Sequence, residues 1–188
     1  VALTDTRGLP LIGGENWSHG KLPSIYQGTM VRPVAPRIFS LDPPRHLKGS
    51  PQVEQLRLLD RLNREHLRQH PGENELDARM KSYGLAARMQ VAAREAFDIS
   101  RESEATKKMY GIDQKVTSDY GTRCLIARRL IERGVRFVQV YTQNQFWDHH
   151  GGINKALPTA CRKVDRPSAA LVSDLKQRGL LDQSLIHI

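Results

Sequence analysis

The sequence of 188 residues lacks the patterns that assign proteins to several common functional classes. No apolar run approaches the roughly 18 residues that a membrane-spanning helix needs, and no stretch has the pattern of a signal peptide. The patterns of a phosphate-binding P-loop, of the GxSxG turn of serine hydrolases and of a dinucleotide-binding loop are also missing. The sequence therefore gives no motif-based reason to assign the chain to the P-loop, serine-hydrolase or dinucleotide-binding classes.

Cysteine and aromatic residues are scarce. The two cysteines, Cys124 and Cys161, lack the CxxC spacing of redox and zinc motifs, and the apolar helical surroundings of Cys124 predict a small core residue. Aromatic residues make up 6% of the chain, which is few for a protein that stacks the bases of single-stranded nucleic acid. The sequence therefore offers neither a redox motif nor a stacking platform.

Positive charge is abundant but dispersed. The net charge of the chain is +9. Many of the arginines fall on predicted helices, among them Arg57, Arg61, Arg64, Arg68, Arg128, Arg129 and Arg133. We interpret them as solvated helix faces, with a nucleic-acid-binding patch as the alternative. The dispersed charge predicts no specific nucleic-acid partner, and the chain has no candidate transmembrane segment.

The first two thirds of the chain divide by composition into two segments. Residues 1–50 are rich in glycine and proline, which predicts surface loops around a core formed elsewhere. Residues 51–118 predict a helical insertion, with Ser50 as the N-cap of its first helix and Pro51 at the first helical position. Three helices are expected there, over residues 51–70, 73–96 and 102–110.

Residues 119–188 predict an α/β core segment. Its expected elements are a helix over 120–133, a strand over 135–141, a helix over 166–178 capped by Asp165, and a strand beginning at 184. This alternation is typical of a parallel sheet. Because so few strands cannot form a sheet alone, we expect residues 1–188 to be an internal fragment of one larger domain.

One cluster of candidate ligands follows the predicted strand 135–141. It is Trp147-Asp148-His149-His150-Gly151, at the edge of a parallel sheet where ligands usually bind. Asp148 and His150 are two residues apart, so they face the same side of an extended segment, whereas His149 faces the other way. A carboxylate and an imidazole suit a divalent metal ion, and Asn154 could hydrogen-bond to a substrate or to a ligand.

An ordinary surface loop, whose histidines only hydrogen-bond to their neighbours, is the alternative. A tetrahedral metal site needs further ligands, and the sequence shows no convincing partner for this cluster. His19, His46, His66 and His70 are isolated from it along the chain.

Five segments carry a resemblance to a known family: residues 16–18, 22–29, 124–140, 147–151 and 174–182. In order along nearly the whole chain, they resemble the bacterial domain-of-unknown-function family numbered 1501. That family is similar to the sulfatase and alkaline-phosphatase superfamily. The resemblance therefore implies an α/β/α sandwich of the alkaline-phosphatase-like type, incomplete and helix-rich in this fragment.

The resemblance also implies a function. The family's Trp-Asp-x-His element matches Trp147, Asp148 and His150, which implies a divalent ion (Zn, Mn, Ca or Mg) held by Asp148 and His150. It implies hydrolysis of phosphate or sulfate esters of small molecules or polysaccharides, in the periplasm or outside the cell.

The catalytic nucleophile is not identified in this chain. The family's aspartate-bearing element is expected before Val1, and its Glu-Phe-Gly-Arg-Thr and Asp-His elements after Ile188, so the chain as given is expected to be inactive. The alternative function is a non-catalytic binding protein of the same fold that recognises sulfated or other anionic polysaccharides.

Overall fold

The structure, a computed structural model, describes residues 1–23, 26–35, 37–38, 44, 46, 49–70, 80 and 95–187. In these ranges no helix is both long enough and apolar enough to cross a membrane. The elements in chain order are β1 (Ala2–Leu3), η1 (Gly13–Trp17), β2 (Met30–Val31), α1 (Ser50–Gln69), η4 (Ile99–Arg101), α3 (Glu104–Met109), α4 (Ser118–Glu132), β3 (Gln139–Val140), α5 (Ile153–Gln177) and η5 (Leu181–Gln183).

A small parallel sheet confirms the predicted α/β class. Its strand order is β2-β1-β3, and the paired residues are Ala2 with Met30 and Gln139, and Leu3 with Val31 and Val140. The central strand therefore comes from the first residues of the chain. This corrects the prediction that residues 1–50 form only surface loops, because two-residue strands are too short to show an alternating pattern.

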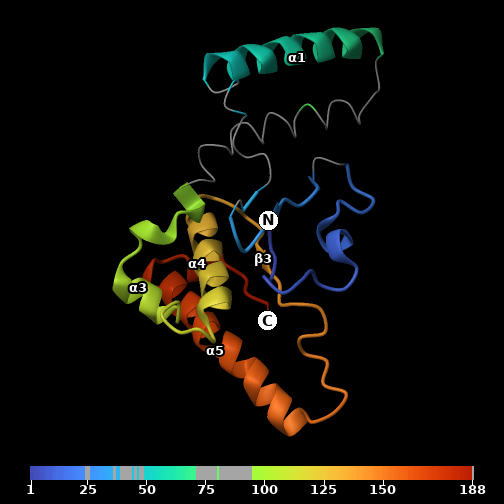
Figure 1. Ribbon diagram of the computed structural model, residues 1–188. Coiled ribbons are helices and arrows are strands. Elements are labelled where there is room, and N and C mark those ends of the chain that lie inside the picture. Colours follow the sequence, from blue (N-terminus) through green and yellow to red (C-terminus); the bar gives the residue numbers. More distant parts are fainter. Residues whose placement is uncertain are drawn as a thin grey trace.

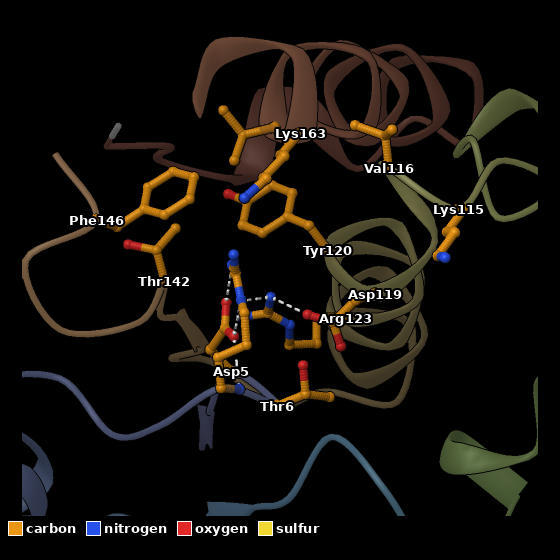
Figure 2. Close-up of a pocket in the computed structure, with 12 residues that line it drawn as sticks. Asp5, Thr6, Lys115, Val116, Asp119, Tyr120, Arg123, Thr142, Phe146 and Lys163 are labelled. Carbon is orange, nitrogen blue, oxygen red and sulfur yellow. Dashed lines mark hydrogen bonds and ion pairs between the residues drawn. The ribbon is translucent and has the colours of Figure 1, made fainter. Parts of the chain in front are cut away.

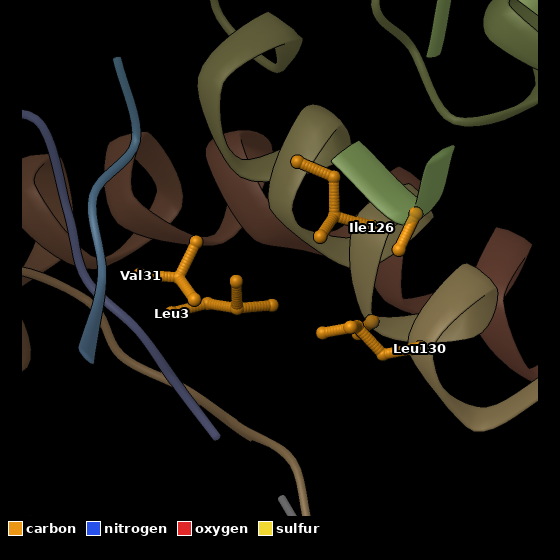
Figure 3. Packing of buried hydrophobic residues seen from close by; sticks show 6 residues of the cluster. Leu3, Val31, Ile126 and Leu130 are labelled. Atoms are coloured by element: carbon orange, nitrogen blue, oxygen red, sulfur yellow. The ribbon is translucent and has the colours of Figure 1, made fainter. Parts of the chain in front are cut away.

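The sheet packs against α4 through one apolar cluster (Figure 3). Leu3 and Val31 project from the sheet toward Ile126 and Leu130 of α4, and all four side chains are buried. Burying an aliphatic side chain of this size contributes roughly 1.5–3 kcal/mol. The sheet is therefore held in place mainly by α4.

A second cluster joins α4 to α3 and α5, which lie beside it (Figure 1). Cys124 and Leu125 of α4 pack with Tyr110 and Ala170, and Cys124 is 1% exposed, as predicted for a core residue. Gly121 allows this packing, because a Cβ at that position would collide with the backbone carbonyl oxygen of Tyr110. α4 thus lies over one face of the sheet, and α3 and α5 pack against α4.

Buried arginines correct the prediction that the arginines of α4 form a solvated face. The side chain of Arg128 is 2% exposed, and its Nη2, Nη1 and Nε lie 2.8, 2.6 and 3.0 Å from carboxylate oxygens of Glu102, Glu132 and Asp174. The contact with Asp174 lacks hydrogen-bond geometry. Arg129 is also buried and pairs with Glu102. Helical spacing could not reveal this, since Glu102 and Asp174 are distant in sequence.

The helix boundaries largely follow the predicted signals. The first helix ends at His70 as expected, although its N-cap is Gly49 rather than Ser50. The helices expected over 102–110 and 120–133 correspond to α3 and α4. They are followed by Gly111 and Gly134, with φ of 67° and 82°, because glycine adopts positive φ without steric cost. The predicted helix over 73–96 lies mostly outside the described residues.

Three expectations for the last third were wrong. The strand is limited to Gln139–Val140, because its neighbour β1 offers only two residues for pairing. The last helix begins at Ile153 rather than at 166, and it continues through Pro158 and Pro167. Pro167 is buried, so its packing against the rest of the core offsets the loss of the backbone hydrogen bond that proline cannot donate. Residues 184–187 form no strand.

The ion pairs of Arg128 give a prediction for stability. Replacing Arg128 by alanine removes one of the two arginines that each of its carboxylate partners contacts, together with two charged hydrogen bonds, so the free energy of unfolding should fall by about 1.5–3 kcal/mol. Urea denaturation followed by circular dichroism measures this loss. Arg136→Ala, at an exposed position beyond α4, is the matched control and should change stability by less than about 0.5 kcal/mol. Equal effects of the two substitutions would contradict the buried network.

Candidate functional site

The candidate site lies at the edge of the sheet where the three parallel strands end. β1 runs into Thr4–Gly8 and β3 into the loop 141–152, and the first turns of α4 lie beside both (Figure 2). Polar residues that follow β1 and β3 lie close together here, because parallel strands end at the same edge of the sheet. In open parallel sheets this is the edge at which ligands bind.

Arg123 of α4 links these segments. Its Nη2 donates to Asp5 Oδ2 at 2.9 Å and to Asp119 Oδ2 at 2.7 Å, and its Nη1 donates to the main-chain oxygen of Tyr141. Asp5 also accepts hydrogen bonds of 3.0 Å from Nε and Nη2 of Arg7. The side chains of Asp5 and Arg123 are almost wholly buried, at 0% and 2% exposed. Arg123 thus fixes the end of β1 to the end of β3.

These contacts determine the charge state of the carboxyl group. Burial alone would raise the pKa of Asp5, but the hydrogen bonds from Arg7 and the charge of Arg123 outweigh burial, so the pKa lies below its usual value of 3.8. Asp5 is therefore ionised, and both of its carboxylate oxygens accept hydrogen bonds. By contrast, burial raises the pKa of the Cys124 thiol to about 12, which leaves it protonated at neutral pH and unsuited as a nucleophile.

A cavity of about 230 Å³ opens between this network, α4 and α5. Its wall includes charged residues from several segments and two aromatic rings: Arg7, Lys115, Arg123, Lys163, Tyr120 and Phe146 (Figure 2). Phe146 belongs to the loop that carries the predicted ligands. The cavity therefore adjoins the predicted cluster along the chain.

The structure brings the two predicted metal ligands together. His150 Nε2 lies 2.9 Å from Asp148 Oδ2, so the two side chains face the same side as expected, and they are 86% and 43% exposed. His149 is half-buried instead, and its Nε2 is buried with no hydrogen-bond partner among the described residues. Trp147 is 50% exposed and packs edge-on against Phe146, with ring centroids 4.8 Å apart. Asn154 lies exposed in the first turn of α5.

The donor atoms of this pair fit a divalent ion, but their number is incomplete. Two ligands of a tetrahedral zinc ion lie about 3.3 Å apart, so the carboxylate and the imidazole need to separate by only a few tenths of an ångström. Within the described part of the chain, no group of three or more His, Cys, Asp and Glu residues is placed to hold a metal. Asp5 is not a third ligand, because Arg7 and Arg123 occupy its oxygens.

The cavity was not predicted from the sequence. Asp5 and Arg7 fell within the segment interpreted as loops, and Arg123 was not distinguished from other helical arginines. Lys115 and Lys163 belong to different segments that only the packing of α5 on α4 brings together. One local signal could have indicated part of the cavity wall. Residues 1–3 are apolar and are followed by the polar residues Thr4 and Asp5, which is the pattern of a short buried strand that ends in a polar loop.

Comparisons with known proteins identify one family. A family model described as "Protein of unknown function (DUF1501)" matches residues 1–188. A search of curated proteins found no match, and neither did a search of solved structures.

The lowered pKa of Asp5 predicts how stability depends on pH. Because the folded-state pKa lies below 3.8, the contribution of the ionised carboxylate is fully present above that pH and is lost as pH falls through the folded-state pKa. Asp5→Asn should therefore lower the free energy of unfolding by about 1–3 kcal/mol at neutral pH. This difference from the unsubstituted protein should shrink on acidification.

Urea denaturation at a series of pH values measures the effect. Asp182→Asn, at an exposed position in η5, serves as the control and should change stability little at any pH. A difference between Asp5→Asn and the unsubstituted protein that persists below the folded-state pKa would contradict the predicted charge state of Asp5.

Proposed function

The chain belongs to the DUF1501 family of proteins of unknown function. From its geometry we propose that it is part of a metal-dependent hydrolase of phosphate or sulfate esters. The observation that carries this proposal is the contact of 2.9 Å between Asp148 Oδ2 and His150 Nε2 in the loop that joins β3 of the parallel sheet to α5. Membership of the sulfatase and alkaline-phosphatase superfamily and a periplasmic or secreted location are parts of the same proposal.

The exposure of the pair supports a role in binding rather than in folding. Asp148 and His150 contribute little to the core, because both side chains are exposed and screened by water. An ion held by their oxygen and nitrogen atoms would be open to solvent and to a substrate. Bound there, a divalent ion would supply charge neutralisation at the ester oxygens and activation of the attacking group.

The chain's own residues would position the ion and its surroundings. Asp148 and His150 would supply two ligands, whereas the side chain of His149 is half-buried and is not a ligand. Trp147 packs on Phe146, which connects the ligand pair to the wall of the cavity. The cationic side chains of that cavity would favour a negatively charged substrate.

A second candidate function is non-catalytic recognition of sulfated or other anionic polysaccharides. It is favoured by one observation: the described residues provide two ligands and no third one, whereas the cavity retains its cationic side chains. Such a protein would bind anions without a metal ion and would not hydrolyse them. Metal content and turnover therefore separate the two functions.

The proposal predicts the effects of three substitutions in the protein expressed from its complete gene. Asp148→Ala and His150→Ala each remove one ligand, so bound metal and hydrolysis of an aryl phosphate or aryl sulfate should fall together. His149→Ala should have a smaller effect, of about 10- to 100-fold at most, because its side chain is half-buried and is not a proposed ligand. Metal analysis and steady-state kinetics measure both quantities.

His187→Ala, at an exposed position far along the chain from the cluster, is the control and should leave both quantities unchanged. The proposal would be wrong if Asp148→Ala and His150→Ala retained the metal content and turnover of the unsubstituted protein.

A further inference from the structure

The cavity beside the candidate site carries an excess of positive charge. Two carboxylates in its wall, Asp5 and Asp119, are already paired with Arg7 and Arg123. Lys115 and Lys163 also line the cavity, and neither forms an ion pair with the residues that the structure describes. Because the two carboxylates and the two arginines cancel in charge, the two lysines give the wall a net charge of +2. An anion is the complement of such a cavity.

The cavity also has an apolar side. Phe146 is 7% exposed, and Tyr120, Val116 and Val164 add further apolar surface to the wall. Lys163 Nζ lies 5.5 Å from the centroid of the Phe146 ring, so the charge and the ring share one part of the wall (Figure 2). A ligand that satisfies both features has a charged group attached to an apolar body.

The size of the cavity limits the ligand. A dry protein cavity of about 150 Å³ is enough to hold benzene. The volume of about 230 Å³ therefore accommodates one ring and a single tetrahedral anionic group, and a larger ligand would extend through the open side of the cavity. A long polysaccharide or a nucleic-acid strand could place only one terminal group inside it.

We propose that this cavity binds a small organic anion, an aromatic or compact apolar phosphate or sulfate monoester. Lys163 binds the anionic oxygens, while Phe146 and Tyr120 contact the apolar body. Arg123 is a positioning residue, since its hydrogen bonds to Asp5 and Asp119 hold the wall together. The choice of phosphate and sulfate rests on the proposed function, whereas the charge and the apolar surface come from the cavity itself.

Binding without hydrolysis tests this proposal. Titration calorimetry with phenyl phosphate and phenyl sulfate, in the presence of EDTA, measures affinity in the full-length protein when no divalent ion is available. Phenol, which lacks the charge, and inorganic phosphate, which lacks the ring, should each bind more weakly than phenyl phosphate. Equal binding of inorganic phosphate and phenyl phosphate would overturn the role given to the rings.

Variants assign the binding to this cavity. Lys163→Gln should weaken the binding of phenyl phosphate about tenfold, and Lys163→Arg should restore most of the affinity. Lys155→Gln removes the same charge from the same helix, α5, outside the cavity wall, and should leave the affinity unchanged. Phe146→Leu should weaken phenyl phosphate but not inorganic phosphate. Unchanged thermal unfolding midpoints show that each variant is folded.

The outcomes separate this proposal from the proposed hydrolase activity. Binding in EDTA that depends on Lys163 and survives Asp148→Ala supports the cavity even if no ester is hydrolysed. Binding that disappears with Asp148→Ala and is unaffected by Lys163→Gln would overturn the cavity as the anion site. An equal loss of affinity in Lys155→Gln and Lys163→Gln would also overturn it, because the attraction would then come from the general positive charge.

Discussion

The edge of the sheet depends on the hydrogen bonds of one buried guanidinium group, that of Arg123. Its planar fork of N–H donors meets acceptors from three segments: Asp5 after β1, Asp119 in α4 and the main-chain oxygen of Tyr141 after β3. The strands are only two residues long, so backbone hydrogen bonds between them are few. This side chain therefore provides a large part of the link between β1 and β3, and without its acceptors it would leave an unpaired charge in the interior.

The same chemistry fixes the two helices that form the cavity walls. Arg128 of α4 lies within 3.0 Å of carboxylate oxygens of Glu102, Glu132 and Asp174, and the last of these belongs to α5. Tyr120 and Arg123 of α4 and Lys163 of α5 are held across the cavity by this packing. The paired arginines thus keep the wall in place, while Lys163, which forms no ion pair within the described part of the chain, remains available for a ligand.

Local signals in the sequence predicted the helices better than the strands or the charges. The helices expected over 102–110 and 120–133 end where α3 and α4 end, because the positive φ after a helix favours glycine, and Gly111 and Gly134 stand there. The spacing of Asp148 and His150 correctly placed the two side chains on one face. The buried position of Arg128 could not be predicted, since its carboxylate partners are distant in sequence. The cavity was missed for the same reason, because its wall is assembled from segments that only tertiary packing brings together.

The most direct test of the account is a crystal structure of the full-length protein grown with zinc or manganese, with data collected at the absorption edge of the metal. The account predicts an anomalous peak about 2.0–2.2 Å from Asp148 Oδ2 and His150 Nε2, with the remaining ligands supplied from outside the described residues or by solvent. A peak located elsewhere, or an Asp148–His150 contact that stays at 2.9 Å with no ion beside it, would contradict the assignment of this pair as metal ligands.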